Sequence, residues 1–168
     1  MRQAVERAGL LSKTNRLIAK FALLIIYLAV LSYGLFFAES LGRSVEHGSY
    51  NIIPFHEIRR YIHYADALGW ETVAVNLLGN VAAFLPFGFL ITSFFPENDK
   101  AHPVSVAGLS LLFSVTIELL QHFTSVGAAD IDDVILNTAG GFLGYLLYIA
   151  WRFAAYGSVN RLTEEVAT

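Results

Sequence analysis

Four stretches of the sequence are apolar and long enough to cross a lipid bilayer as α-helices, and they constrain the fold more than any other feature. A spanning helix needs about 20 mostly apolar residues, because each residue rises about 1.5 Å through a hydrocarbon core about 30 Å thick. The sequence predicts spans over residues 17–38, 73–95, 104–123 and 134–156. We therefore expect an all-α integral membrane protein, a compact bundle of four transmembrane helices that forms a single membrane domain over residues 1–168.

Composition agrees with a membrane location and excludes several functions. Hydrophobic residues make up 55% of the chain and charged residues 15%, whereas about 25% would be charged in a soluble domain. The formal net charge is -3 and the basic residues are scattered, so we expect no nucleic-acid partner. The chain has no cysteine, which excludes disulfides, thiolate catalysis and cysteine-ligated zinc.

The distribution of Lys and Arg predicts that both termini are cytoplasmic. Eight basic residues then lie inside: Arg2, Arg7, Lys13, Arg16, Lys20, Lys100, Arg152 and Arg161. Three lie outside: Arg43, Arg59 and Arg60. A cleaved signal peptide is the alternative for the first stretch, but its apolar run exceeds a usual signal-peptide core and no clear A-x-A site follows. We expect a retained helix.

The loop between the first two spans, residues 39–72, contains a short amphipathic segment. Pro54 is a favourable first residue for a helix. Apolar residues then recur on one face: Phe55, Ile58, Ile62 and Ala65. Aromatic residues typical of membrane interfaces accompany them: Tyr61, Tyr64 and Trp70. The pattern predicts a short external helix on the membrane surface, with a lid and a plain connector as alternative roles.

Polar residues, which are costly inside a bilayer, gather toward the outer end of the expected spans. The candidate ligand-binding residues are Asn76, Asn80, Glu118, Gln121, Asp130, Asp133 and Asn137. The amides also suit interhelical hydrogen bonds worth about 0.6 kcal/mol each. Asp132 or Asp133 is expected to cap the last span. Neither role explains three aspartates without a nearby base, so we interpret the cluster as an outer-leaflet site.

Oxygen-rich sites of this kind suit hard cations. A divalent cation is thus a candidate ligand, with Glu118, Asp130 and Asp133 as the candidate metal ligands, and no other cofactor is expected. Elsewhere the pattern indicates packing. Gly140 and Gly144 form a G-x-x-x-G motif that permits close helix contact.

Four blocks of the sequence resemble the VanZ-like family of bacterial membrane proteins. They are N-I-I-P-F at 51–55, N-L-L-G-N-V-A-A-F-L-P-F-G-F-L at 76–90, I-E-L-L-Q at 117–121 and D-I-D-D-V-I-L-N-T-A-G-G-F-L-G at 130–144. The resemblance implies a four-helix protein of the bacterial plasma (inner) membrane, and the family's founding member is associated with low-level teicoplanin resistance. Relatives often carry a basic residue just before the aspartates, where this chain has Gly127, Ala128 and Ala129.

Two functions remain open at this point. The first is a non-enzymatic cell-envelope protein that binds a polar, lipid-linked or cationic ligand, such as a lipid-linked cell-wall precursor or a glycopeptide, beside membrane lipid. The alternative is an intramembrane enzyme that acts on a lipid headgroup, with Glu118 or an Asp as general base and a metal as a candidate helper. No recognised catalytic motif supports it. A transporter ranks last, because the inner halves of the spans are almost wholly apolar.

Overall fold

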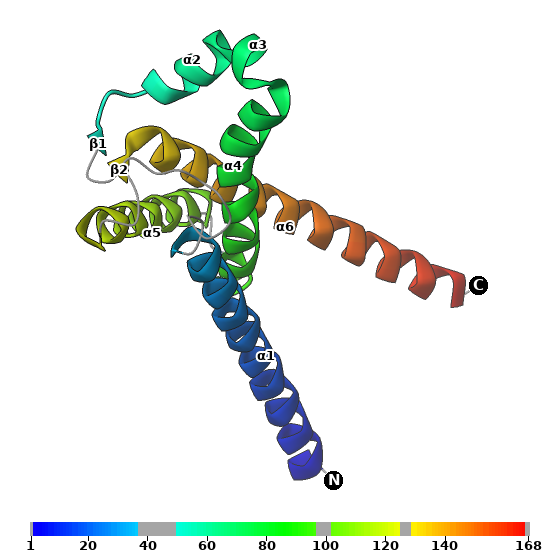
Figure 1. Cartoon of the computed structure of the whole chain (residues 1–168). Helices are drawn as coiled ribbons and strands as arrows, with labels where there is room; N and C mark the ends of the chain where they lie inside the picture. Colours follow the sequence, from blue (N-terminus) through cyan, green and yellow to red (C-terminus); the bar gives the residue numbers. More distant parts are fainter. Residues whose placement is uncertain (1, 37–49, 97–101, 125–128, 167–168) are drawn as a thin grey trace. The chain divides into compact units, whose positions relative to one another are not determined.

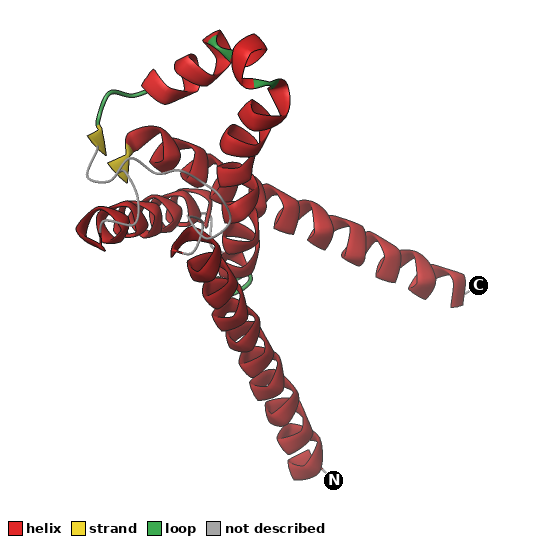
Figure 2. Cartoon of the chain, in the orientation of Figure 1, coloured by secondary structure: helices red, strands yellow, loops and turns green. Residues whose placement is uncertain are grey.

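The structure is a computed structural model that describes residues 2–36, 50–96, 102–124 and 129–166, with side chains over 12–34, 50–96, 102–124 and 129–155. Nearly all described residues are helical (Figure 2). The elements in chain order are α1 (Arg2–Phe36), β1 (Tyr50–Asn51), α2 (His56–His63), α3 (Ala65–Leu68), α4 (Trp70–Thr92), α5 (His102–Thr124), β2 (Ala129–Asp130) and α6 (Ile131–Val166). Figure 1 shows them with these labels.

Within the described residues, four helices are long and apolar enough to cross a membrane, as the sequence predicts. The apolar windows are Ser12–Gly34 in α1, Trp70–Thr92, His102–Thr124 and Ile131–Ala155. Each window begins a few residues before the expected span, because the helix continues into polar residues beyond the apolar run. The all-α membrane fold is therefore confirmed.

The chain divides into two compact units, Met1–Arg43 and Ser44–Thr168. The first unit is α1, whose apolar side chains are mostly exposed, among them Ile18, Ile25 and Val30. In a helix that crosses a bilayer, such side chains face lipid or another protein surface. The second unit contains the remaining described elements and all of the candidate polar residues.

In the second unit, α6 packs closely against α4 through glycine. A Cβ atom on Gly140 would overlap the carbonyl oxygen of Val81, and one on Gly144 would overlap that of Leu85. Gly88 of α4 faces the backbone of Gly141 in the same way. The packing role predicted for the G-x-x-x-G motif is confirmed, because the two backbones touch where a side chain would separate them.

The remaining long helix of this unit, α5, packs against both α4 and α6. Ser110 is fully buried beside Gly141 and donates its hydroxyl to the carbonyl oxygen of Val106 at 2.8 Å. Toward α4, the rings of Phe87 and Phe113 stack with centroids 4.8 Å apart. Small residues thus face α6 and aromatic residues face α4, which fills the space between the three helices.

The predicted amphipathic helix is present, but it starts later and ends earlier than the sequence indicated. It begins at His56, because Phe55 has φ 64°, a left-handed backbone conformation that cannot be part of a regular α-helix. Ala65, the last residue of the predicted stripe, belongs to the separate helix α3. Gly69, at φ 86°, then turns the chain into α4.

The glycine contact predicts that Gly144→Leu lowers the thermal stability of the protein in detergent, because the new side chain meets backbone that has no room to move. Overpacking of this kind costs about 1–3 kcal/mol. Gly108→Leu is the matched control, since a Cβ atom there meets nothing within 4 Å. Equal melting temperatures for the two variants would contradict the contact.

Candidate functional site

A short parallel bridge attaches the loop before α2 to the residues before α6. Tyr50 of β1 pairs with Ala129 of β2, and Asn51 pairs with Asp130. The side-chain amide of Asn51 also donates to Oδ1 of Asp130 at 2.9 Å. The loop is therefore attached to Asp130 by both backbone and side chain.

Asp130 caps the N-terminus of α6. Its Oδ1 accepts the backbone N–H of Asp132 at 2.8 Å, the usual bond between an N-cap side chain and the second helical residue. The backbone N–H of Asp130 donates to Oε2 of Glu118 at 2.9 Å, which connects the end of α5 to the start of α6. The prediction that Asp132 or Asp133 caps this helix is wrong, because α6 begins at Ile131 and the cap position falls on Asp130.

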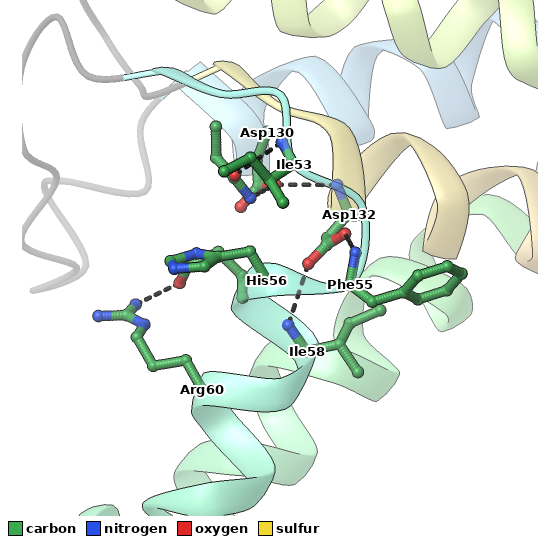
Figure 3. A network of polar contacts seen from close by, with 9 residues as sticks. Ile53, Phe55, His56, Ile58, Arg60, Asp130 and Asp132 are labelled. Atoms are coloured by element: carbon green, nitrogen blue, oxygen red, sulfur yellow. Dashed lines mark hydrogen bonds and ion pairs between the residues drawn. The ribbon is translucent and has the colours of Figure 1, made fainter.

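Asp132 instead caps α2, which lies more than 70 residues earlier in the chain. Its Oδ1 accepts the backbone N–H of Phe55 at 2.5 Å, and its Oδ2 accepts that of Ile58 at 3.0 Å (Figure 3). The first N–H groups of a helix have no partner within the helix, and a carboxylate also suits the positive end of its dipole. Asp132 is only 1% exposed, so these bonds compensate for burying its charge.

Two of the candidate amides form hydrogen bonds between helices, and one bonds within its own helix. Asn80 of α4 donates to Oδ1 of Asp133 at 2.5 Å, and buried Asn137 of α6 donates to Oγ of Ser114 at 2.9 Å. Asn76 donates to the carbonyl oxygen of Thr72 in its own helix at 2.8 Å. The side chain of Gln121 is half-buried and forms no hydrogen bond with the described residues.

The structure thus brings most of the predicted residues into one network around the start of α6. Asn80, Glu118, Asp130 and Asp133 belong to it, and Asn137 lies about one turn further along the helix. Sequence reasoning missed Asn51 and the role of Asp132 as the cap of α2. Asn51 opens the first of the blocks that resemble the VanZ-like family, and only that resemblance pointed to it.

The network is acidic. Burial raises the pKa of the Asp130 carboxyl above its usual value, and the nearby charges of Asp132 and Glu57 raise it further. The hydrogen bonds from Asp132 N–H and from Asn51 act in the opposite direction. Glu57 itself is paired with the guanidinium of Arg60 and with His56.

The chemistry of the site is that of hydrogen-bond acceptors. In the part of the chain that the structure describes, no group of three or more His, Asp and Glu side chains is arranged to hold a metal ion. A metal at Glu118, Asp130 and Asp133 stays a prediction. What the arrangement offers a ligand is a set of negatively charged and amide oxygens at the end of three helices.

The Asp132 contacts predict that Asp132→Ala exposes the start of α2. The loss should be about 1–3 kcal/mol, the usual cost of a buried donor without a partner. Hydrogen exchange should accelerate at the amides of Phe55 and Ile58, and Asp132→Asn should protect one of them, because its amide oxygen still accepts. Asp66→Ala, an exposed acid of α3, is the control. Unchanged exchange at both amides would contradict the cap.

Comparison with known proteins shows the family of the chain. The model of the VanZ/LLP1 family matches residues 22–152, a range that contains every residue of the network. Protein VanZ from Enterococcus faecium is 42% identical over 73 residues, and this alignment covers 44% of the chain and 44% of the relative. No solved structure matches the chain significantly. Four helices able to span a membrane, with a family match over most of the sequence, show that the chain belongs to the VanZ/LLP1 family.

Proposed function

We propose that this membrane protein lies in the plasma membrane of a bacterium with both termini in the cytoplasm, and that its acidic network faces the outside. Lys and Arg are concentrated in the N-terminal half of α1, and Arg152 and Arg161 lie in the C-terminal half of α6, which supports this orientation. The network lies where α6 begins and in the last two turns of α5, with Asn80 about three turns into α4, and we place it toward one membrane face. On this orientation that face is the outer one.

The function we propose is the binding of a polar ligand that carries a cationic group, either a lipid-linked cell-wall precursor or a glycopeptide. The observation that supports it most directly is the gathering of carboxyl groups around the start of α6. These are Glu57, Glu118, Asp130, Asp132 and Asp133. Among the described residues, neither Asp130 nor Asp132 forms an ion pair with Lys, Arg or His. A cation would compensate for this charge.

Asp130 is the carboxylate best placed to meet such a ligand. Its Oδ1 accepts two hydrogen bonds, whereas its Oδ2 accepts none from the described residues. Both oxygens of Asp132 are occupied by backbone donors. Because Asp130 is half-buried and its pKa is raised, a bound ammonium group would relieve the cost of its charge.

We include a role in glycopeptide tolerance in this proposal because of the similarity to Protein VanZ. The alignment covers less than half of either chain, so the role is proposed and not carried over directly. The intramembrane-enzyme alternative gains no observation in its favour from the described residues. Their polar groups are arranged as acceptors, without a nucleophile and base in contact. We therefore take binding as the proposed function.

Orientation can be tested in this chain without removing any native cysteine, because it has none. Asp66→Cys and Thr124→Cys should react with a membrane-impermeant maleimide in intact cells, since both lie on the expected outer side. Asn98→Cys should react only after the cells are opened. Labelling of Asn98→Cys in intact cells, with the other two silent, would invert the proposed topology.

The binding site can be tested by the teicoplanin tolerance that the protein confers on a susceptible Gram-positive host. Asp130→Asn keeps an oxygen for the cap of α6 but replaces the unoccupied Oδ2 with an amide, so tolerance should fall to that of the host alone. Glu118→Gln should act in the same direction.

Asp66→Asn is the matched control, because it makes the same change on the exposed surface of α3. An epitope tag should show that all variants reach the membrane in equal amounts. If Asp130→Asn and Glu118→Gln both retain full tolerance, the acidic network is structural. If the unaltered protein confers none, glycopeptides are not its ligands.

A further inference from the structure

The segment that joins β1 to α4 carries large apolar side chains that the protein leaves uncovered. Helix α2 buries no residue, and α3 buries only Ala65. Ile52 is 73% exposed, Ile53 63% and Ile62 54%. We call the following set the apolar loop surface: Ile52, Ile53, Phe55, Ile62, Tyr64, Leu68 and Trp70. Exposure of this much apolar surface to water is costly, at about 25 cal/mol per Å².

Both ends of this segment are attached to the starts of membrane-spanning helices. At one end, Phe55 and Ile58 donate their backbone N–H groups to Asp132, the second residue of the apolar window of α6. At the other end, α3 leads through Gly69 into Trp70, the first residue of the apolar window of α4. Figure 1 shows α2 and α3 between these two points. The segment is thereby held at the level where two spans enter the membrane.

Its side chains are distributed as in helices that lie in a membrane interface. Ile58 and Ile62 are four residues apart in α2, about one turn, and so share one face. Arg59 lies beside this face and is exposed, within reach of lipid phosphates. Arg60 precedes Ile62 by two residues and points about 200° away from it. Tyr64 and Trp70 are of the type enriched at lipid headgroups.

We propose that the apolar loop surface is seated in the bilayer, at the boundary between headgroups and acyl chains. Its occupant is membrane lipid, because Trp70 of this surface begins α4, whose next turns carry further exposed apolar residues, such as Val75 and Leu78. The segment thus forms a membrane-bound rim beside the acidic network. This inference does not depend on the ligand proposed above.

The proposal can be tested with single cysteines at Ile53, Ile62 and Arg60, each carrying an environment-sensitive NBD fluorophore. The labelled protein is placed in nanodiscs of phosphatidylcholine and phosphatidylglycerol, where both faces of the bilayer are accessible. Two quenchers are compared, a lipid with a doxyl group near the top of its acyl chain and iodide in the water. Arg60→Cys is the matched control, from the same helix but the opposite face.

We expect the doxyl lipid to quench the labels at Ile53 and Ile62 strongly and iodide to quench them weakly, with the reverse at Arg60. Iodide quenching at all three positions would place the segment in water and overturn the proposal. Protection of Ile53 and Ile62 from both quenchers would also overturn it, because protein would then cover the surface. Two apolar positions are used so that one poorly folded variant does not decide the result.

Discussion

The backbone contact between α4 and α6 is the interaction on which the polar network depends, since it sets how close the two helices come. Lipid is as apolar as the helix surfaces, so helices in a membrane associate through close packing and hydrogen bonds. Glycines at 88, 140 and 144 allow the backbones to touch. At that separation Asn80 of α4 reaches Asp133 of α6, two turns before Gly140. A wider spacing would leave both polar groups without this partner.

The carboxylates of the network are held mainly by backbone N–H groups at or near the starts of helices. Asp130 caps α6, Asp132 caps α2, and Glu118 accepts the N–H of Asp130. A carboxylate buried without such donors would be strongly unfavourable, and so would the open N-terminus of a buried helix. Each hydrogen bond between a carboxylate and a helix N-terminus reduces both costs, so much of the negative charge in this region stabilises the fold. Fewer carboxylate oxygens are therefore open to a ligand than the number of acidic residues indicates. The clearest example is Oδ2 of Asp130, which accepts no hydrogen bond from the described residues.

Asp132 connects two parts of the molecule with different surroundings. It belongs to the first turn of a spanning helix, yet both of its oxygens accept N–H groups at the start of α2, outside that helix. The left-handed conformation of Phe55 is unfavourable by about 1–2 kcal/mol for a residue with a side chain. The bond from its N–H to Asp132 offsets that cost. The position of the apolar loop surface therefore depends on a carboxylate within the network.

The four spans, the glycine contact and the gathering of polar residues at one membrane face were predictable from the sequence. These features depend on properties that repeat along the chain: apolar length, the spacing of small residues on a helix, and the depth of each residue in its span.

The partner of each carboxylate was not predictable in this way. Asp132 finds Phe55 and Ile58 only because the parallel bridge and the turn at Phe55 bring a distant loop to the start of α6. The side chain of Asn76, which sequence position grouped with Asn80, donates to the carbonyl oxygen of Thr72 in its own helix. Sequence alone determined the membrane helices and the face where polar groups collect, because helical periodicity is local. Tertiary structure decided which oxygen accepts which N–H, because that choice requires a separation and direction that only the packed backbone provides.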